Sequence, residues 1–348
     1  MEAPGRGLAD TLRANRTFGP EEALSGPLEA SNSVPVWELS PPFGEEEPME
    51  GTIRDPDTSS VVVGVDGSQS ARDAVRWASA EAARRGRPLH LVHAADTDGR
   101  RFHLSAASVE RVRRAGSELL EETAGAIATE HPDLHVTTEF SRRDPVTALH
   151  RAAGLHGTIV VGNRGLGGFN SLMLGSVGLK TAAGARTPLI VVRGVEDGTE
   201  AGVVLAAVRD ELDLECTRYA AREAELRKAS LRLLHVWNAL QSVGNVVSML
   251  DNIEEIADEY VERLKAITDE IRGEHPGLGV HADAEKSMSV AGVLVEASHH
   301  ADLLVMGGRR SPGYIGPSLG HIAHSLVHHA HCPVLLFPRH GQDLRRKP

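Results

Sequence analysis

The chain has 348 residues, a length that favours two domains of ordinary size. Its net charge of -11 argues against nucleic acid and anionic membrane surfaces as partners, because binding to phosphates needs a basic surface. Two cysteines exclude a disulfide framework and fit a reducing compartment. The sequence has neither an apolar run of ~18 residues nor a signal peptide, so we expect a soluble, cytoplasmic protein.

Residues 1–58 are expected to form a disordered tail. The segment is rich in Pro, Gly, Ser and Glu, and its sparse apolar residues cannot bury enough surface to offset the entropy of ordering. One alternative is a partner-binding stretch around Val34-Pro35-Val36-Trp37. Another is that translation begins at Met49, shortly before the first periodic pattern.

Apolar runs and amphipathic segments alternate across a first domain, 59–195. The expected strands are 61–65, 88–94, 134–140, 159–162 and 188–193. The expected helices are 70–85, 107–130, one that begins with Asp144-Pro145, and 176–185. Ser70 is the predicted cap of the first helix, and Gly86 its predicted end. This alternation predicts an α/β fold with a parallel sheet and helices on both faces.

A glycine-bearing loop follows the fourth strand, with the spacing Gly162-x2-Gly165-x9-Gly175-Ser176. Glycines let backbone N–H groups approach an anion closely, and the first turn of the next helix offers unpaired N–H groups and a favourable dipole. Ser176 is placed to cap that helix and to donate its hydroxyl to a phosphate. The alternative is a plain glycine-rich surface loop.

This loop and its place after a fourth strand resemble the ATP-binding loop of the universal stress protein family. The resemblance implies two Rossmann-like domains of the adenine nucleotide alpha hydrolase type, with strand order 3-2-1-4-5. It also implies ATP as the ligand, with or without Mg²⁺. The implied nucleotide contacts are Asp66, Ala94, Gly162, Gly165, Gly175, Ser176 and Val177. For Asp66 the alternative is a turn residue ahead of Gly67.

The second half of the chain, 201–340, repeats the first. Residues 231–236 match 89–94, and 333–336 match 188–191, a period of about 140 residues that indicates domain duplication. The expected strands are 202–208, 231–236, 280–285, 303–307 and 333–336. The expected helices are 214–229, 246–272 and 290–299.

The second repeat departs from the loop pattern. Gly307 and Gly320 match the first and last glycines, but Arg310 replaces Gly165 and His321 replaces Ser176. Val208 or Arg209 stands in place of Asp66. We therefore predict weak or no ATP binding there and a structural role, as one half of a pseudo-dimer within the chain. A homodimer of whole chains is also compatible with this pattern.

Catalytic and metal patterns are sparse. No G-x4-G-K-[ST], G-x-S-x-G or H-E-x-x-H motif occurs. His324 and His328 share a helix face, but without a placed carboxylate we expect no metal site. The leading hypothesis is a non-enzymatic, ATP-binding regulatory module of the stress response. The alternatives are an ATP-cleaving or adenylating enzyme, with Arg164 and Lys180 as the nearby cations, and a nucleotide-free interaction scaffold.

Overall fold

The computed structural model describes residues 60–97, 105–165, 175–193, 200–238, 253–308 and 319–338. The predicted tail, 1–58, lies outside these residues. Among the described residues, no helix is both long and apolar enough to cross a membrane.

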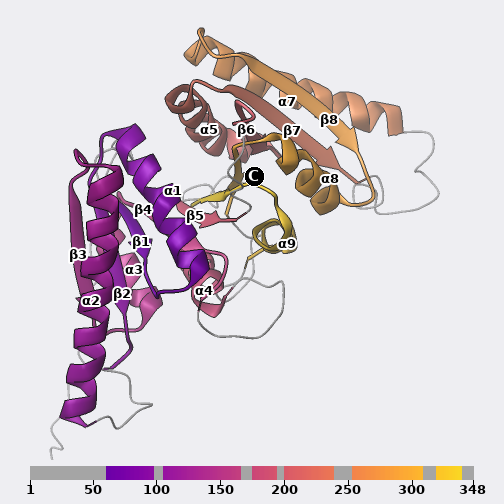
Figure 1. Ribbon diagram of the computed structural model, residues 1–348. Helices are drawn as coiled ribbons and strands as arrows, with labels where there is room; N and C mark the ends of the chain where they lie inside the picture. The colour runs from indigo at the N-terminus through magenta and orange to yellow at the C-terminus, as the bar shows by residue number, and fades with distance from the viewer. Residues whose placement is uncertain are drawn as a thin grey trace, which may run out of the picture. The chain divides into compact units, whose positions relative to one another are not determined.

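The first repeat supplies five strands and four helices to the described part of the chain (Figure 1). The strands are β1 (Val61–Gly64), β2 (Leu89–Ala94), β3 (Val136–Ser141), β4 (Thr158–Gly162) and β5 (Leu189–Val192). The helices are α1 (Gln69–Arg85), α2 (Ala106–Glu130), α3 (Pro145–Ala153) and α4 (Ser176–Gly184).

The second repeat follows the same order in its described residues. Its strands are β6 (Val203–Ala207), β7 (Ser230–Trp237), β8 (Val280–Lys286), β9 (Leu303–Gly307) and β10 (Val334–Phe337). Its α-helices are α5 (Leu214–Arg227), α7 (Ile253–Glu274), α8 (Val290–Ala297) and α9 (His321–His329). Two short 3₁₀ turns, η2 (Glu211–Asp213) and η4 (Ser298–His300), precede α5 and follow α8.

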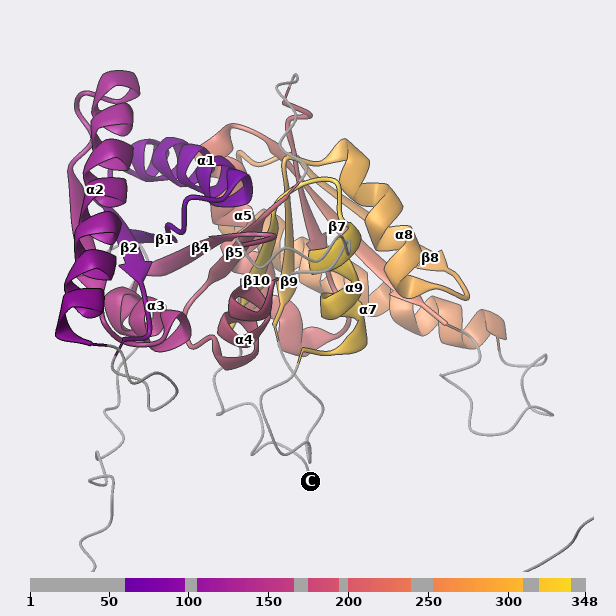
Figure 2. The same ribbon diagram turned by 60° about the horizontal axis from the view of Figure 1, so that its bottom comes forward.

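All ten strands belong to one sheet, in the order β3-β2-β1-β4-β5-β10-β9-β6-β7-β8 (Figure 2). Within each repeat the neighbouring strands are parallel, as predicted. Each repeat contributes five strands in the predicted order 3-2-1-4-5, and the pairing between the repeats was not predicted. Strands β5 and β10 pair antiparallel, with Ile190 opposite Leu335, so the two repeats share one continuous sheet.

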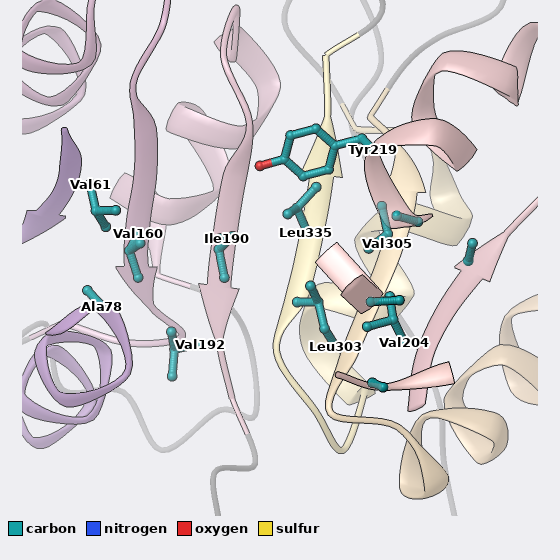
Figure 3. Close-up of a cluster of buried hydrophobic side chains, with 14 of the residues drawn as sticks. Val61, Ala78, Val160, Ile190, Val192, Val204, Tyr219, Leu303, Val305 and Leu335 are labelled. Atoms are coloured by element: carbon teal, nitrogen blue, oxygen red, sulfur yellow. The ribbon is translucent and has the colours of Figure 1, made fainter. Parts of the chain in front are cut away.

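Each face of this sheet is covered by helices from both repeats. One buried cluster takes side chains from α1, α2, α5 and α7, among them Ala74, Leu120, Cys216 and Leu264. The other takes side chains from α3, α4, α8 and α9, among them Leu149, Ala182, Leu294 and Leu326. Figure 3 shows the first cluster, which includes Ile190, Leu335 and Tyr219. The apolar core therefore runs without a break from one repeat into the other.

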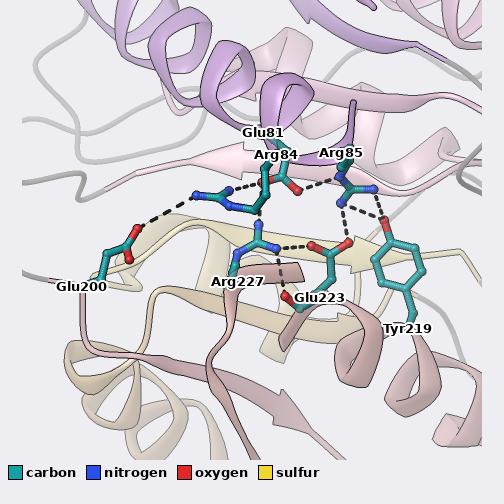
Figure 4. A network of polar contacts seen from close by, with 7 residues as sticks. All are labelled: Glu81, Arg84, Arg85, Glu200, Tyr219, Glu223 and Arg227. Carbon is teal, nitrogen blue, oxygen red and sulfur yellow. Dashed lines mark hydrogen bonds and ion pairs between the residues drawn. The ribbon is translucent and has the colours of Figure 1, made fainter. Parts of the chain in front are cut away.

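A buried group of four charged residues joins α1 to α5, and we call it the charge quartet (Figure 4). It consists of Glu81, Arg85, Glu223 and Arg227. Within each helix the Glu pairs with the Arg four residues later, Glu81 with Arg85 at 2.7 Å. Between the helices, Arg85 pairs with Glu223, and Arg227 pairs with Glu81 at 2.7 Å. The pairing is reciprocal, as expected for two equivalent helices that face each other.

Two aromatic side chains contact the arginines of the charge quartet. Trp77 and Tyr219 occupy equivalent places, eight residues before the Arg of their own helix. The guanidinium of Arg227 lies 5.9 Å from the Trp77 ring centroid, and Arg85 donates hydrogen bonds of 3.3 Å to the Tyr219 hydroxyl. Each arginine thus contacts an aromatic side chain of the opposite helix, and the Tyr219 hydroxyl accepts from donors of Arg85 that are buried.

Burial raises the pKa values of the two glutamates, and the positive charges of the arginines lower them. Burial alone would raise the pKa of Glu81, but the charges of Arg227, Arg85 and Arg84 outweigh it and hold that pKa at about 2. For Glu223, burial and the negative charge of Glu81 outweigh the charges of Arg85 and Arg227, so the pKa of Glu223 is raised. Glu81 also has Arg84 beside it, and Leu226 stands at that place in α5.

Several predicted element boundaries need correction. The N-cap of α1 is Ser68, whose hydroxyl accepts the Ala71 N–H, and Ser70 lies inside the helix. The long helix predicted from Val246 is seen from Ile253 onward, and residues 239–252 lie outside the described part. The predicted cap at Asp144 is confirmed, with Pro145 at the first helical position.

Candidate functional site

The carboxyl ends of β1 and β4 bring the predicted aspartate and glycines together. Asp66 follows β1, and a Cβ added to Gly165 would lie 2.6 Å from an Asp66 carboxylate oxygen. Only glycine at position 165 therefore permits this approach without displacing the carboxylate. A Cβ on Gly175 would lie 3.5 Å from the Gly165 backbone nitrogen, so the two ends of the loop also meet. Residues 166–174, between them, lie outside the described part.

Asp66 also behaves as the turn residue of the alternative interpretation. One of its carboxylate oxygens accepts the Ser68 N–H at 2.9 Å, which is the Asx-turn geometry expected ahead of a helix. The other oxygen lies beside Gly165. The two roles are compatible, since a carboxylate has two oxygens and accepts several hydrogen bonds.

Ser70 connects α1 to the end of β4, a role that sequence reasoning missed. Its hydroxyl donates to the Asn163 side-chain oxygen at 2.6 Å and accepts the Arg164 N–H at 3.0 Å. A Cβ on Gly162 would overlap the Ser70 backbone oxygen, so glycine is needed there for close packing. These contacts fix the start of the loop against the start of α1.

The first turn of α4 faces the same edge of the sheet. Its N-cap is Gly175, which has no side chain with which to cap the helix, so the prediction that Ser176 is the cap is wrong. Ser176 is the first helical residue and is exposed, while Val177 is half-buried against the core. The N–H groups of this first turn are therefore available to an acceptor outside the helix.

Ala94 lies at the end of β2, opposite Ser141 of β3. The register of β1 and β2 ends with Gly64 opposite Val92, and Asp66 and Ala94 each lie two residues beyond that pair. His93 adds a cross-link here, because its Nδ1 donates to the Val65 carbonyl at 2.7 Å. All seven predicted residues thus lie at the carboxyl ends of neighbouring strands or at the start of α4.

Two arginines make this edge of the sheet electropositive. Arg164 is exposed in the loop, and Arg193 follows β5 and donates to the Ala330 carbonyl at 3.1 Å. Burial, and then the positive charge of Arg164, lower the pKa of Arg193. Two like charges held near each other favour an anion between or beside them. Arg193 was not predicted, because its neighbourhood depends on the strand order.

A cavity of about 580 Å³ lies elsewhere, at the amino ends of the strands in the first repeat. It is lined by residues that include Gly86, Arg87, His131 and His135, most of them exposed. None of the predicted nucleotide residues lines it. The cavity therefore lies away from the carboxyl ends of the strands, where ligands bind in doubly wound sheets.

Comparison with known proteins agrees with this architecture. A model of the universal stress protein family matches residues 58–193 and 202–338. The chain belongs to the universal stress protein family. It is 26% identical over 294 residues to a universal stress protein of Mycolicibacterium smegmatis, with 79% of this chain and 96% of that protein covered. A universal stress protein of Mycobacterium tuberculosis is 27% identical over 288 residues, covering 82% and 98%.

Among solved structures, a universal stress protein from Archaeoglobus fulgidus matches with a TM-score of 0.61 at 17% identity. The match covers 81% of this chain and 98% of that one. At this identity the likeness concerns the fold alone.

The second repeat of this family member lacks the aspartate. Val208 corresponds to Val65, since His235 Nδ1 donates to its carbonyl at 2.9 Å as His93 does in the first repeat. The residue at the place of Asp66 is therefore Arg209, whose side chain forms an ion pair with Asp210 at 2.9 Å. Arg310, predicted to replace Gly165, lies outside the described residues. His321, at the start of α9, is exposed.

No group of three or more His, Cys, Asp or Glu side chains among the described residues is arranged to hold a metal ion. Cys216 and Cys332 are both buried, and burial raises the pKa of each thiol to about 12. At neutral pH both are protonated and poor nucleophiles.

Proposed function

We propose that the first repeat binds an adenine nucleotide, ATP, at the carboxyl ends of β1 and β4. The observation that carries this proposal is the approach of Gly165 to the Asp66 carboxylate beside the uncapped start of α4. The α4 N–H groups and the positive charge of Arg164 and Arg193 favour the phosphates. Asp66 is suited to accept hydrogen bonds from sugar hydroxyls, and Ala94 offers a small apolar contact for the base.

The nucleotide is held rather than turned over, and the protein acts as a regulatory module of the stress response. Hydrolysis would need a general base positioned against an attacking water. The nearest carboxylate, Asp66, is already committed to the Ser68 N–H and to the Gly165 approach. Turnover of ATP slower than roughly 0.1 per second would agree with this, because enzymes usually run at 1–1000 per second.

Binding of labelled ATP, measured by equilibrium dialysis, tests the site. We expect one ATP per chain. Gly165→Ala should weaken binding at least about tenfold, equivalent to ~1.4 kcal/mol, because the new methyl group displaces the Asp66 carboxylate. The matched control is Gly320→Ala in the second repeat, where an added Cβ meets no atom within 4 Å. No binding at millimolar ATP, or two equivalent sites per chain, would sink the proposal.

Asp66→Asn separates the two roles of the aspartate. The amide oxygen still accepts the Ser68 N–H, so the turn and the fold should persist. Loss of the negative charge weakens an acceptor aimed at sugar hydroxyls, so ATP affinity should fall while the unfolding midpoint stays within error. An unchanged affinity would leave Asp66 as a turn residue only.

A further inference from the structure

Two histidine pairs lie in the second repeat, and they differ in geometry. His299 and His331 are stacked, with ring centroids 3.3 Å apart and planes 17° from parallel. His324 and His328, one turn apart on α9, are tilted by 57°, and their Nε2 atoms approach to 3.3 Å. The lone pair of an imidazole nitrogen lies in the ring plane. Stacked rings cannot direct two lone pairs at one point, whereas the tilted pair can.

The Nε2–Nε2 separation of His324 and His328 matches the edge of a metal coordination tetrahedron. Zinc binds imidazole nitrogen at about 2.0–2.1 Å, which places two nitrogens of a tetrahedral site about 3.3–3.4 Å apart. Without an ion, the two rings form a hydrogen bond between their Nε2 atoms at 3.3 Å. The same separation lets both nitrogens reach one tetrahedral ion without a change of rotamer.

Packing holds one of these side chains in place. His328 is only 3% exposed, and its neighbours Leu326 and Val327 are fully buried. His324 is half-buried, so the pair also keeps access to solvent.

The pair is specific to the second repeat. Helices α4 and α9 are equivalent, because each has nine residues and begins at a glycine with φ of -59° and ψ of 154°. Leu179 and Ala183 of α4 stand where α9 has His324 and His328. The second repeat, which has no counterpart of Asp66, therefore carries two histidines on α9 where the first repeat has apolar residues on α4.

We propose that His324 and His328 form a binding site for a divalent transition-metal ion of the zinc and copper class. The described residues supply these two ligands, and the remaining positions are open to water or to a small external ligand. Nitrogen ligands suit both ions, and copper should bind more tightly than zinc. The site is independent of nucleotide binding in the first repeat.

Calorimetric titration of the full chain, purified without a polyhistidine tag and free of nucleotide, tests the site with Zn²⁺. We expect one ion per chain. His324→Gln should lower the affinity about tenfold or more, because the amide keeps hydrogen-bonding capacity but is a poor metal ligand. The control is the double change His299→Ala and His331→Ala, which removes two exposed histidines and should leave the affinity unchanged.

Electron paramagnetic resonance with Cu²⁺ gives a second readout. The native chain should show nitrogen hyperfine structure from two imidazoles, and His324→Gln should show that of one. His328 is buried, so the circular dichroism of His328→Gln is checked before its titration is interpreted. Absence of Zn²⁺ binding, or equal affinity in the native chain and His324→Gln, would overturn the proposal and leave a hydrogen-bonded pair.

Discussion

The two repeats of this universal stress protein are alike in their core and unlike at their strand ends. Both have the strand order 3-2-1-4-5 and equivalent helices on both faces. At the carboxyl ends, Asp66 of the first repeat is replaced by Arg209 in the second, and Leu179 by His324. Buried apolar residues maintain the framework, while single residues at equivalent places differ in charge and polarity. Retention of the fold therefore does not imply retention of the site.

The repeats are also alike where α1 meets α5. Glu81 and Arg85 of α1 have the equivalents Glu223 and Arg227 in α5, and the four make reciprocal ion pairs. Substitutions in this charge quartet and at the ends of the two helices test how far α1 and α5 are equivalent.

The largest effect is expected for Arg227→Ala. The change leaves Glu81 and Glu223 short of a buried partner and removes the Trp77 contact. Loss of one partner from a buried ion pair costs about 3–5 kcal/mol, to be measured as the free energy of unfolding in urea. Arg218→Ala on the same helix is the control, because its pairs with Glu215, Glu270 and Glu274 are partly exposed and each contributes about 1 kcal/mol or less. Equal losses would contradict a special role for the quartet.

The pH dependence of Glu81→Gln should separate the two glutamates. The pKa of Glu81 is about 2 in the folded chain, against an ordinary value of 4.5 for Glu, so its charge stabilises the fold above pH 4.5 and loses that effect as the pH falls towards 2. The stability gap between the native chain and Glu81→Gln should therefore shrink by about 2 kcal/mol from pH 7 to pH 3. For Glu223→Gln the gap should not shrink, since the pKa of Glu223 is raised. Parallel curves for the two variants would refute this distinction.

A smaller effect is expected at the ends of α1 and α5. Both helices end in a left-handed residue, Gly86 with φ of 60° and Lys228 with φ of 53°. Only glycine adopts this conformation without strain, so Lys228→Gly should stabilise the chain by about 0.5–1 kcal/mol in urea unfolding. Gly86→Ala should destabilise it by a similar amount. A loss of stability in Lys228→Gly would show that the lysine side chain matters more than the backbone.

Thiol labelling should show the smallest effect in the native state. Cys216 and Cys332 both belong to the second repeat, and burial raises the pKa of each thiol to about 12. At pH 8 we expect almost no reaction with a thiol reagent without denaturant. Because one sheet runs through both repeats, labelling in increasing urea should follow the circular dichroism transition of the whole chain. Labelling well below that transition would mean that the second repeat opens alone.

Local patterns predicted much of the fold. Short apolar runs predicted the strands, and the Asp144 cap and the Gly86 helix end were read correctly from single residues. The joining of β5 to β10 was missed, because a strand that pairs across repeats has the same buried pattern, as in Leu189–Val192, as any central strand. Sequence patterns indicate burial and do not identify the neighbouring strand.

The candidate site was predicted less completely. Asp66 and the glycines occur at a recognisable spacing after two predicted strands, and the structure places them together. The Ser70 bridge to Asn163 and the nearness of Arg193 to Arg164 depend on contacts between residues far apart in sequence. The 3.3 Å approach of His324 to His328 depends on side-chain rotamers, which helical spacing alone does not determine. The roles of the seven predicted nucleotide residues remain predictions.

The antiparallel junction of β5 and β10 has a consequence for how the two halves can differ. In an assembly of two identical chains, every substitution occurs twice, once on each side of the symmetry axis. Here a single polypeptide carries both halves, so each half can differ on its own. Arg209 at the place equivalent to Asp66, and Leu226 at the place equivalent to Arg84, each occur once. The tether also keeps the partners together at any dilution, since their association is intramolecular. A single chain can therefore change one half while the other half stays as it was.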